Sequence, residues 1–293
     1  METKTTNVMA SDGRLLCVES GGEPAGLPVL VHTGTPNSRH LSASWLEDAQ
    51  DRGIHLISYD RPGYGGSTPQ PERTVASCVD DVRDIAKAFG AARLAVWGIS
   101  GGGPHALACA ALAPDLVVAV ASLAAVAPYE ADGLDYFTGM GQYNVDDTRL
   151  FMADRAAALE KTHRDREEML ETTPEGLHKA FESLLSPADA AVLTMDIAKE
   201  LVASLQSGLA PGDDGWWEDS CALLGPWGFS LGNIHIPVQV WHGAHDRFVP
   251  FQHGEWIAKN IPGADVHLTD TDGHLTLAVN RVPEVHDWLL QHF

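Results

Sequence analysis

Leu94-Ala-Val-Trp-Gly-Ile-Ser-Gly-Gly-Gly-Pro-His105 is the stretch of sequence that decides the fold. Its first four residues favour β-structure and predict a short buried strand, while the alanine-rich run 104–113, with proline in its first turn, predicts a helix. The turn between them, 98–102, reads Gly-x-Ser-x-Gly. So tight a turn strains the serine backbone, and only residues without a Cβ fit beside it. The pattern predicts an exposed hydroxyl on Ser100, a candidate nucleophile, beside the NH of Gly101.

Strands and helices alternate on both sides of this stretch. Val8 to Ser20 alternates around Asp12-Gly13 and predicts a β-hairpin. The fully apolar run 116–126 predicts a central parallel strand that is covered on both faces. Further strands are predicted at 28–32, 54–59, 238–241 and 264–268, and helices at 41–51, 74–89 and 251–260. A closing helical segment is predicted at 275–292, with a step at Pro283. The alternation predicts an α/β fold with a mostly parallel sheet flanked by helices.

The alternation stops between Pro128 and about Leu231. This block is predicted to hold helices only, at 147–170, 174–185, 187–205 and 213–224. A helical block between two strands of one sheet indicates a cap rather than a linker. We therefore expect a core of residues 1–127 and 232–293, with a cap of residues 128–231 inserted between core strands.

The composition restricts the partners that the protein can have. The net charge of −21 is spread over all 293 residues, which argues against binding to nucleic acid or to an anionic membrane. The amino terminus lacks a basic region followed by an apolar core, so we expect a cytoplasmic protein, as a monomer or homodimer, with a small-molecule substrate. The four cysteines have no metal or redox spacing, and buried free thiols without a metal are the simpler interpretation.

A base and an acid follow the last two predicted strands. A serine hydroxyl is a poor nucleophile until a base takes its proton, and the base works best when a carboxylate fixes its tautomer. Asp246 comes just after the strand 238–241, and His274 comes just after the last strand. Sites in open parallel sheets lie at the carboxyl ends of the strands, so Ser100, Asp246 and His274 are predicted to meet there.

These motifs resemble the α/β-hydrolase superfamily, close to its capped serine hydrolases of the esterase and proline-iminopeptidase-like kind. The similarity covers nearly the whole chain, through His-Thr-Gly-Thr-Pro at 32–36, Asp-Arg-Pro-Gly-Tyr-Gly-Gly-Ser at 60–67, the Ser100 turn, His-Gly-Ala-His-Asp-Arg-Phe-Val-Pro at 242–250 and Asp-Gly-His at 272–274. It implies the α/β-hydrolase fold, with a mostly parallel eight-stranded sheet and an inserted helical cap. It also implies a Ser-Asp-His triad in this chain order, which works without a cofactor or a metal.

The resemblance further implies two backbone donors for an oxyanion. One is the NH of Gly101, and the other comes from the turn Gly34-Thr35. The family more often has glycine directly after the loop histidine, whereas Thr33 intervenes here. The second NH can therefore belong to Thr35 or to Gly34, and the hydroxyl of Thr33 or Thr35 is a further possible donor.

Other polar residues are alternatives to these assignments. Some members of the superfamily take the acid from the end of the strand after the nucleophile, where Glu130 is the alternative to Asp246. His105 and His242 have simpler structural interpretations, as a helix residue and a loop residue. Asp60 is expected to organise its own loop, 60–67, which resembles a phosphate cradle but lacks the Gly-Lys-Ser/Thr ending.

These observations favour a cofactor-free hydrolase of a small, largely apolar carboxylic ester, lactone or thioester. Aromatic and methionine side chains of the cap are expected partly to line an apolar pocket. An aminopeptidase that releases N-terminal proline is the first alternative, with its amine held by Glu130 or by the acidic pairs 146–147 and 213–214. A non-catalytic small-molecule receptor is the second. Epoxide hydrolases and haloalkane dehalogenases are disfavoured, because they need an aspartate where Ser100 stands.

Overall fold

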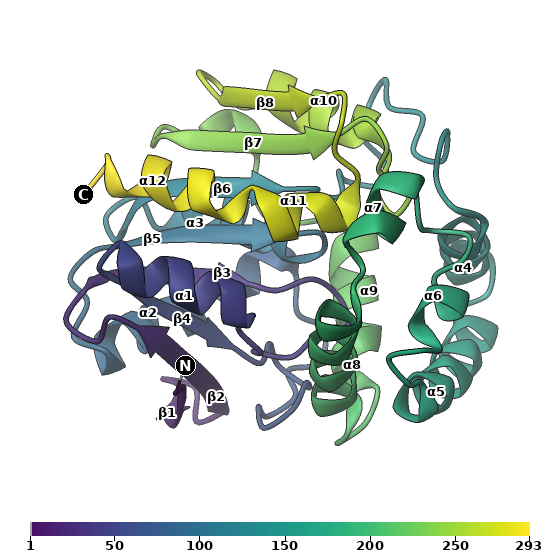
Figure 1. Ribbon diagram of the computed structural model, residues 1–293, viewed down its shortest axis with the longest axis horizontal. Helices are drawn as coiled ribbons and strands as arrows, with labels where there is room; N and C mark the ends of the chain where they lie inside the picture. Colours follow the sequence, from purple (N-terminus) through teal and green to yellow (C-terminus); the bar gives the residue numbers. More distant parts are fainter. Residues whose placement is uncertain (1) are drawn as a thin grey trace.

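The computed structural model describes residues 2–293 and holds an eight-stranded, mostly parallel sheet (Figure 1). The strand order is β1-β2-β4-β3-β5-β6-β7-β8, and only β1–β2 and β2–β4 pair antiparallel. The strands are β1 (Lys4–Met9), β2 (Leu15–Gly22), β3 (Leu27–His32), β4 (Ile54–Tyr59), β5 (Leu94–Ile99), β6 (Val117–Leu123), β7 (Val238–Gly243) and β8 (Asp265–Thr269). The predicted fold class is confirmed.

Local sequence accounts for the main features of the sheet. The predicted hairpin forms with Met9 opposite Leu15, and Gly13 in its turn has a φ of +88° that glycine adopts without strain. β5 and β6 lie in the middle of the sheet and are buried at every position, as expected for strands that are apolar throughout.

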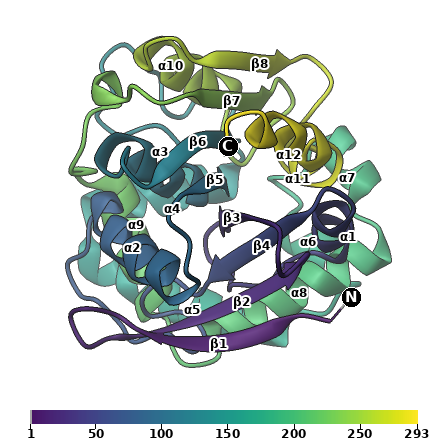
Figure 2. The ribbon, with the colours of Figure 1, turned by 90° about the vertical axis from the view of Figure 1, so that its left-hand side faces the viewer.

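Helices cover both faces of the sheet (Figure 2). One face packs against α1 (Ala43–Asp51), α11 (His274–Asn280) and α12 (Val282–Leu290) in a core that includes Trp97 and Leu289. The other face packs against α2 (Cys78–Ala88), α3 (Gly102–Leu112) and α10 (Phe251–Asn260) in a core that includes Val96 and Ile257. A short 3₁₀ turn, η1 (Val75–Ser77), precedes α2. The site described below lies where this sandwich meets the helices that follow β6.

We call the whole of the chain between β6 and β7 the helical segment. It forms six helices. They are α4 (Gln142–Ala153), α5 (Arg155–Glu171), α6 (Leu177–Ala180), α7 (Pro187–Val192), α8 (Met195–Leu209) and α9 (Asp214–Leu224), followed by the 3₁₀ turn η2 (Leu231–Asn233). Figure 1 places them beyond the carboxyl ends of the parallel strands. The division into a core and a separate cap with boundaries at 128 and 231 stays a prediction.

Three of the helices predicted in this segment were wrong in extent. The predicted helix 147–170 starts earlier and is two helices, because Asp154 leaves the helical conformation and its carboxylate accepts the NH groups of Ala156 and Ala157. The predicted helix 187–205 is also divided, since the side chain of Thr194 caps the start of α8. The predicted helix 174–185 shrinks to the four residues of α6.

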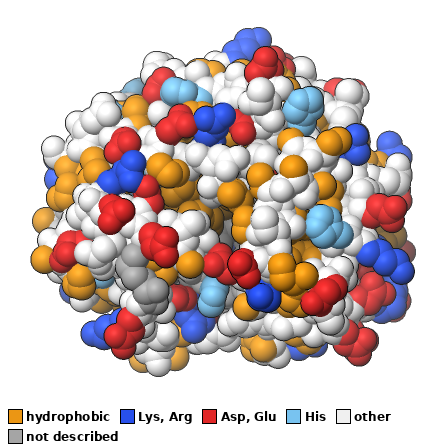
Figure 3. All heavy atoms as spheres, in the orientation of Figure 1, with side chains coloured by type: hydrophobic (Ala, Val, Ile, Leu, Met, Phe, Trp, Pro, Cys, Tyr) orange, Lys and Arg blue, Asp and Glu red, His pale blue; other side chains and the backbone are white. Residues whose placement is uncertain are grey.

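The acidic side chains are distributed over the face of the molecule seen in Figure 3 rather than gathered in one patch, and Lys and Arg side chains lie among them. No helix within residues 2–293 is long and apolar enough to cross a membrane. The expected lack of affinity for nucleic acid and the expected monomer or homodimer stay predictions.

Candidate active site

Ser100 lies in a strained turn between β5 and α3. Its φ is +55°, a left-handed conformation that residues with a side chain seldom adopt. The Ser100 NH donates to the carbonyl of Leu123 at 2.9 Å. A Cβ on Gly98 would lie 2.3 Å from the Gly102 carbonyl oxygen, and one on Gly102 would lie 2.0 Å from that of His32. Glycine is therefore required on both sides of the serine, as the sequence pattern predicts.

His274 and Asp246 meet at the end of the sheet next to this turn. Asp246 follows β7 and is buried, and His274 is the first residue of α11. His274 Nδ1 and Asp246 Oδ2 are 2.7 Å apart. The other carboxylate oxygen of Asp246 accepts the NH groups of Phe248 and Val249 at 2.9 and 2.8 Å. The carboxylate is thereby fixed in one orientation and can hold the histidine in one tautomer.

The surroundings of His274 favour its protonated form. Burial by itself would lower the pKa of His274, but the charge of Asp246 and its hydrogen bond outweigh burial, and Asp189 acts in the same direction. The net result is a pKa above the ordinary value of 6.5. The ring of Phe248 stacks on the imidazole with centroids 4.6 Å apart, which restricts its rotation.

The loop after β3 lies against the Ser100 turn. A Cβ on Gly34 would be 3.3 Å from Ser100 Cβ, and one on Gly101 would be 2.4 Å from Thr35 Oγ1. The structure therefore brings Gly34, Thr35 and Gly101 together around the serine. It directs the two threonine hydroxyls elsewhere, since Thr33 donates to the Ser38 carbonyl at 3.0 Å and Thr35 donates to Asp219 at 2.6 Å. The possibility that a threonine hydroxyl faces an oxyanion does not hold in this arrangement.

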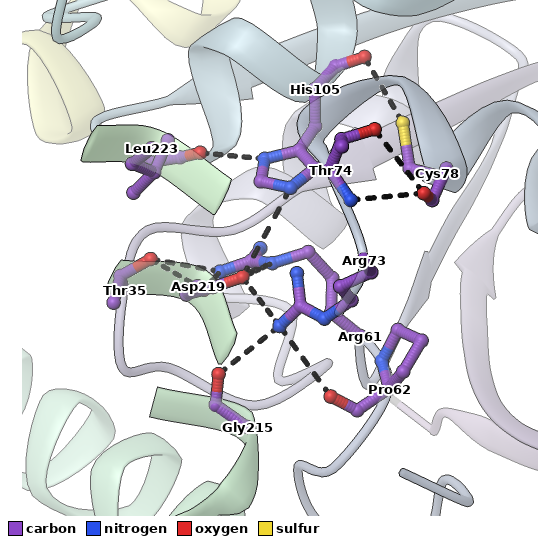
Figure 4. Close-up of polar contacts among 12 residues, drawn as sticks. Thr35, Arg61, Pro62, Arg73, Thr74, Cys78, His105, Gly215, Asp219 and Leu223 are labelled. Atoms are coloured by element: carbon purple, nitrogen blue, oxygen red, sulfur yellow. Dashed lines mark hydrogen bonds and ion pairs between the residues drawn. The ribbon is translucent and has the colours of Figure 1, made fainter. Parts of the chain in front are cut away.

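A buried network of ion pairs and hydrogen bonds holds the loop after β3 in place (Figure 4). Arg61 donates to the carbonyls of Thr33 at 2.6 Å and Gly34 at 3.3 Å, and it forms an ion pair with Asp219 of α9. Arg73 also pairs with Asp219, at 2.7 Å. Burial would raise the pKa of Asp219, but the two guanidinium groups hold it well below 3.8. Asp219 is therefore a buried anion that connects the helical segment to the loop.

Arg61, Arg73 and Asp219 are not predicted from the sequence. Arg61 lies in the 60–67 loop, where the sequence predicts a structural role for Asp60 alone. Asp60 does organise that loop, through hydrogen bonds from the NH groups of Gly66 and Arg39 at 2.9 and 2.8 Å. Asp219 had no signal of its own, because acidic residues are common throughout the chain.

A cavity of about 340 Å³ opens in front of Ser100. Ser100 and His274 both line it, together with Gly34, Thr35 and Gly101. Most of its wall is apolar, and about half of the lining residues lie between β6 and β7, including Tyr136, Met140, Met169, Phe181, Leu201 and Trp216. The cavity can hold a small molecule whose reacting group rests at Ser100 and whose apolar part contacts these helices.

The rival residues lie away from this arrangement or have structural contacts. Glu130 is exposed, and it is Asp246 that contacts His274. His242 bonds the Val249 carbonyl at 2.8 Å, and burial lowers its pKa. His105 bonds the Gly101 carbonyl at 2.8 Å, and burial, with the nearby Arg61, lowers its pKa to about 3. A neutral His105 that donates from Nδ1 therefore supports the Ser100 turn.

One cluster has the donor atoms of a metal site. His32, Cys78 and Cys109 are buried and bring one nitrogen and two sulfur atoms within 4.8 Å of one another. Burial and the neighbouring Cys109 raise the pKa of the Cys78 thiol well above 9.0, so the free thiol is protonated. The cluster therefore fits protonated thiols in a packed core. Cys17 is also buried, and Cys221 is half-buried, and neither forms a disulfide.

Comparison with known proteins identifies the class. A sequence model described as the alpha/beta hydrolase fold matches residues 28–280, and the chain belongs to that family. Among curated relatives, the AB hydrolase superfamily protein YisY of Bacillus subtilis is 24% identical over 252 residues, which is 85% of each chain.

Solved structures share the fold over the full length. An esterase from Thermogutta terrifontis superposes with a TM-score of 0.70 at 19% identity. The superposition covers 99% of this chain and 100% of the esterase chain. An enol-lactonase from Burkholderia xenovorans superposes with a TM-score of 0.67 at 17% identity, covering 98% and 100% of the two chains. At these identities the likeness establishes the fold.

Proposed function

We propose that the protein is a serine hydrolase that cleaves small, largely apolar carboxylic esters through an acyl-enzyme, with lactones and thioesters as related substrates. One observation carries the proposal. Ser100, in its strained turn, lines the same cavity as His274, whose Nδ1 is already bonded to Asp246. A nucleophile, a base and the carboxylate that orients the base are thus gathered where a small molecule fits.

Each residue then has one role in the reaction. Because Asp246 accepts a hydrogen bond from the Nδ1–H group, His274 presents Nε2 as the base that takes the Ser100 proton while Oγ attacks the ester carbonyl. The oxyanion accepts hydrogen bonds from the NH of Gly101 and from that of Thr35 or Gly34. His274 returns the proton to the leaving alcohol, and a water activated in the same way releases the acid. The cycle requires no cofactor.

The substrate class follows from the cavity wall. Apolar side chains of the helical segment favour an acyl or alkyl group over a sugar or phosphate. The names of two structural neighbours, an esterase and an enol-lactonase, agree with ester or lactone chemistry.

The test is covalent labelling with a fluorophosphonate, read by intact-mass spectrometry. We expect one adduct on the wild-type protein, mapping to the peptide that contains Ser100, and no adduct on Ser100→Ala. Ser220→Ala is the matched control, because Ser220 lines the same cavity but bonds the Trp216 carbonyl, and it should label like the wild type. Hydrolysis of a short-chain ester should fall by several orders of magnitude in Ser100→Ala alone. An unlabelled wild-type protein would contradict the proposal.

Release of N-terminal proline is the second candidate, because two carboxylates, Asp147 and Glu200, line the cavity. Both have partners, since Asp147 pairs with Lys161 at 3.2 Å and Glu200 accepts the Ser42 hydroxyl at 2.7 Å. These contacts favour the ester. Turnover of a prolyl amide that is abolished by N-acetylation would reverse this order. Tight binding of a small molecule by a protein that neither labels nor turns over would instead support the receptor alternative.

A further inference from the structure

Asp189 of the helical segment reaches the first turn of α11, the helix that His274 begins. Asp189 belongs to α7 and is fully buried. Its carboxylate accepts the backbone NH groups of His274 at 3.1 Å, Leu275 at 2.7 Å and Thr276 at 3.2 Å. The first NH groups of a helix have no partners within the helix. For α11 these partners come from a residue 85 positions away in sequence from His274.

The sequence around His274 is fitted to this contact. A Cβ on Gly273 would lie 2.3 Å from Asp189 Oδ2, so only glycine admits the carboxylate at this place. The Gly273 NH itself donates a hydrogen bond to the Thr276 hydroxyl oxygen at 2.6 Å. Asp189 Oδ2, which accepts the His274 NH, also accepts the hydroxyl of Ser186 at 2.8 Å. Residues before and after His274 are therefore arranged around one carboxylate.

The charge of Asp189 also acts on the imidazole. Asp246, from the loop after β7, contacts the imidazole of His274, and Asp189 of α7 contacts its backbone NH; His242 of β7 lies 3.6 Å from Asp246. Asp272, two residues before His274, pairs with Arg281 at 2.9 Å. The negative charge of Asp189 stabilises the imidazolium and, with Asp246, raises the pKa of His274.

We propose that Asp189 is a positioning residue for the hydrolysis, which fixes the place of His274 and stabilises its protonated form from the helical segment. This inference rests on the proposed function. During the reaction His274 becomes cationic, so a second nearby anion lowers the free energy of that state. The helical segment thereby supplies part of the catalytic arrangement in addition to the pocket wall.

The test compares the pH dependence of fluorophosphonate labelling in the wild type, Asp189→Asn and Ser186→Ala. The labelling rate constant requires neutral His274 and needs no knowledge of the substrate. In Asp189→Asn we expect the midpoint of the acid limb to move to lower pH by on the order of half a unit. The rate constant on the plateau should fall about tenfold, because the helix loses its fixed position. Ser186→Ala keeps the charge and the three NH contacts, and its midpoint should match the wild type.

The outcomes separate this inference from the proposed function. A folded Asp189→Asn protein with the wild-type midpoint would overturn the inference, as would an equal shift in Ser186→Ala. Circular dichroism reports on folding, and Asp189→Ser, a neutral acceptor, replaces Asp189→Asn if that variant does not fold. If neither variant folds, Asp189 is a structural residue and the inference is wrong. Lack of any wild-type labelling would overturn the proposed function instead.

Discussion

At the scale of single residues, the environment of His274 predicts how activity depends on pH. Burial lowers the pKa of His274, but the charge of Asp246, its hydrogen bond and the charge of Asp189 together raise that pKa above 6.5. In the proposed reaction His274 must be neutral to accept the Ser100 proton. A higher pKa therefore makes His274 a stronger base. It also means that the neutral imidazole is depleted over a wider range of acidic pH.

We expect kcat/KM for an ester to fall as the pH drops through the His274 pKa, with the midpoint of the acid limb above pH 6.5. The sign follows because the free protein loses its base on protonation. Rates measured between pH 5 and 9 in buffers of constant ionic strength provide the check. A full rate maintained well below pH 6.5 would show that a group other than His274 takes the proton.

At the scale of elements, the Ser100 turn depends on how closely α3 approaches β3 and β5. Gly98 and Gly102 lie where backbone carbonyls leave no room for a Cβ. The strain at Ser100 is maintained by this packing and by the hydrogen bond to the Leu123 carbonyl on β6. Stability and the geometry of the Ser100 turn are thus coupled at these glycines.

Gly98→Ala is expected to destabilise the protein by about 1–3 kcal/mol, because its Cβ would meet the Gly102 carbonyl oxygen at 2.3 Å. Labelling at Ser100 should fall with it, since α3 must move. The matched control is Gly232→Ala, where the nearest atom to the new Cβ is 3.7 Å away. Urea unfolding and fluorophosphonate labelling of both variants give the answer, and equal behaviour would mean that the turn tolerates a side chain.

At the scale of the whole molecule, two buried carboxylates join the helical segment to the sheet. Asp189 binds the start of α11, and Asp219 binds Arg61, Arg73 and the Thr35 hydroxyl. One contact lies on the side of His274 and the other on the side of the loop after β3. The helical segment therefore contacts both sides of the cavity through charged groups as well as apolar ones.

Asp219→Asn would leave Arg61 and Arg73 buried with their shared anion removed. We expect the free energy of unfolding to drop by about 3–5 kcal/mol, since an unpaired buried charge is costly. Asp196→Asn serves as the comparison, because the pair of Asp196 with Lys199 is exposed and should contribute little. Denaturant unfolding of both variants is the measurement. A small effect of Asp219→Asn would mean that water or the nearby carbonyls satisfy the two arginines.

The features that could be predicted from the sequence are those that a local pattern of residues determines. The strands, the hairpin and the helices next to the sheet follow from periodicity and from glycine, and they were found close to the expected residues. Ser100, Asp246 and His274 were identified because each follows a strand whose carboxyl end reaches the same edge of the sheet. Their roles in the reaction stay a prediction.

The remainder depends on which partner a particular polar side chain finds in the folded protein. Asp189 and Asp219 lie in a segment rich in acidic residues, and nothing local distinguishes a buried carboxylate there from an exposed one. The divided helices depend on whether Asp154 and Thr194 cap the next helix or point to solvent. The direction of the Thr33 and Thr35 hydroxyls depends on acceptors at Ser38 and Asp219. Sequence pattern does not encode such pairings.

The two carboxylates limit how this protein can be re-engineered. Grafting the pocket helices of a relative onto this sheet would discard Asp189 and Asp219 together with the old pocket, and would leave Arg61 and the start of α11 without their anions. The helical segment is thus not an exchangeable module. A changed substrate range is better sought through single replacements of apolar residues in the cavity wall, such as Leu201 or Met140, which leave both anchors in place.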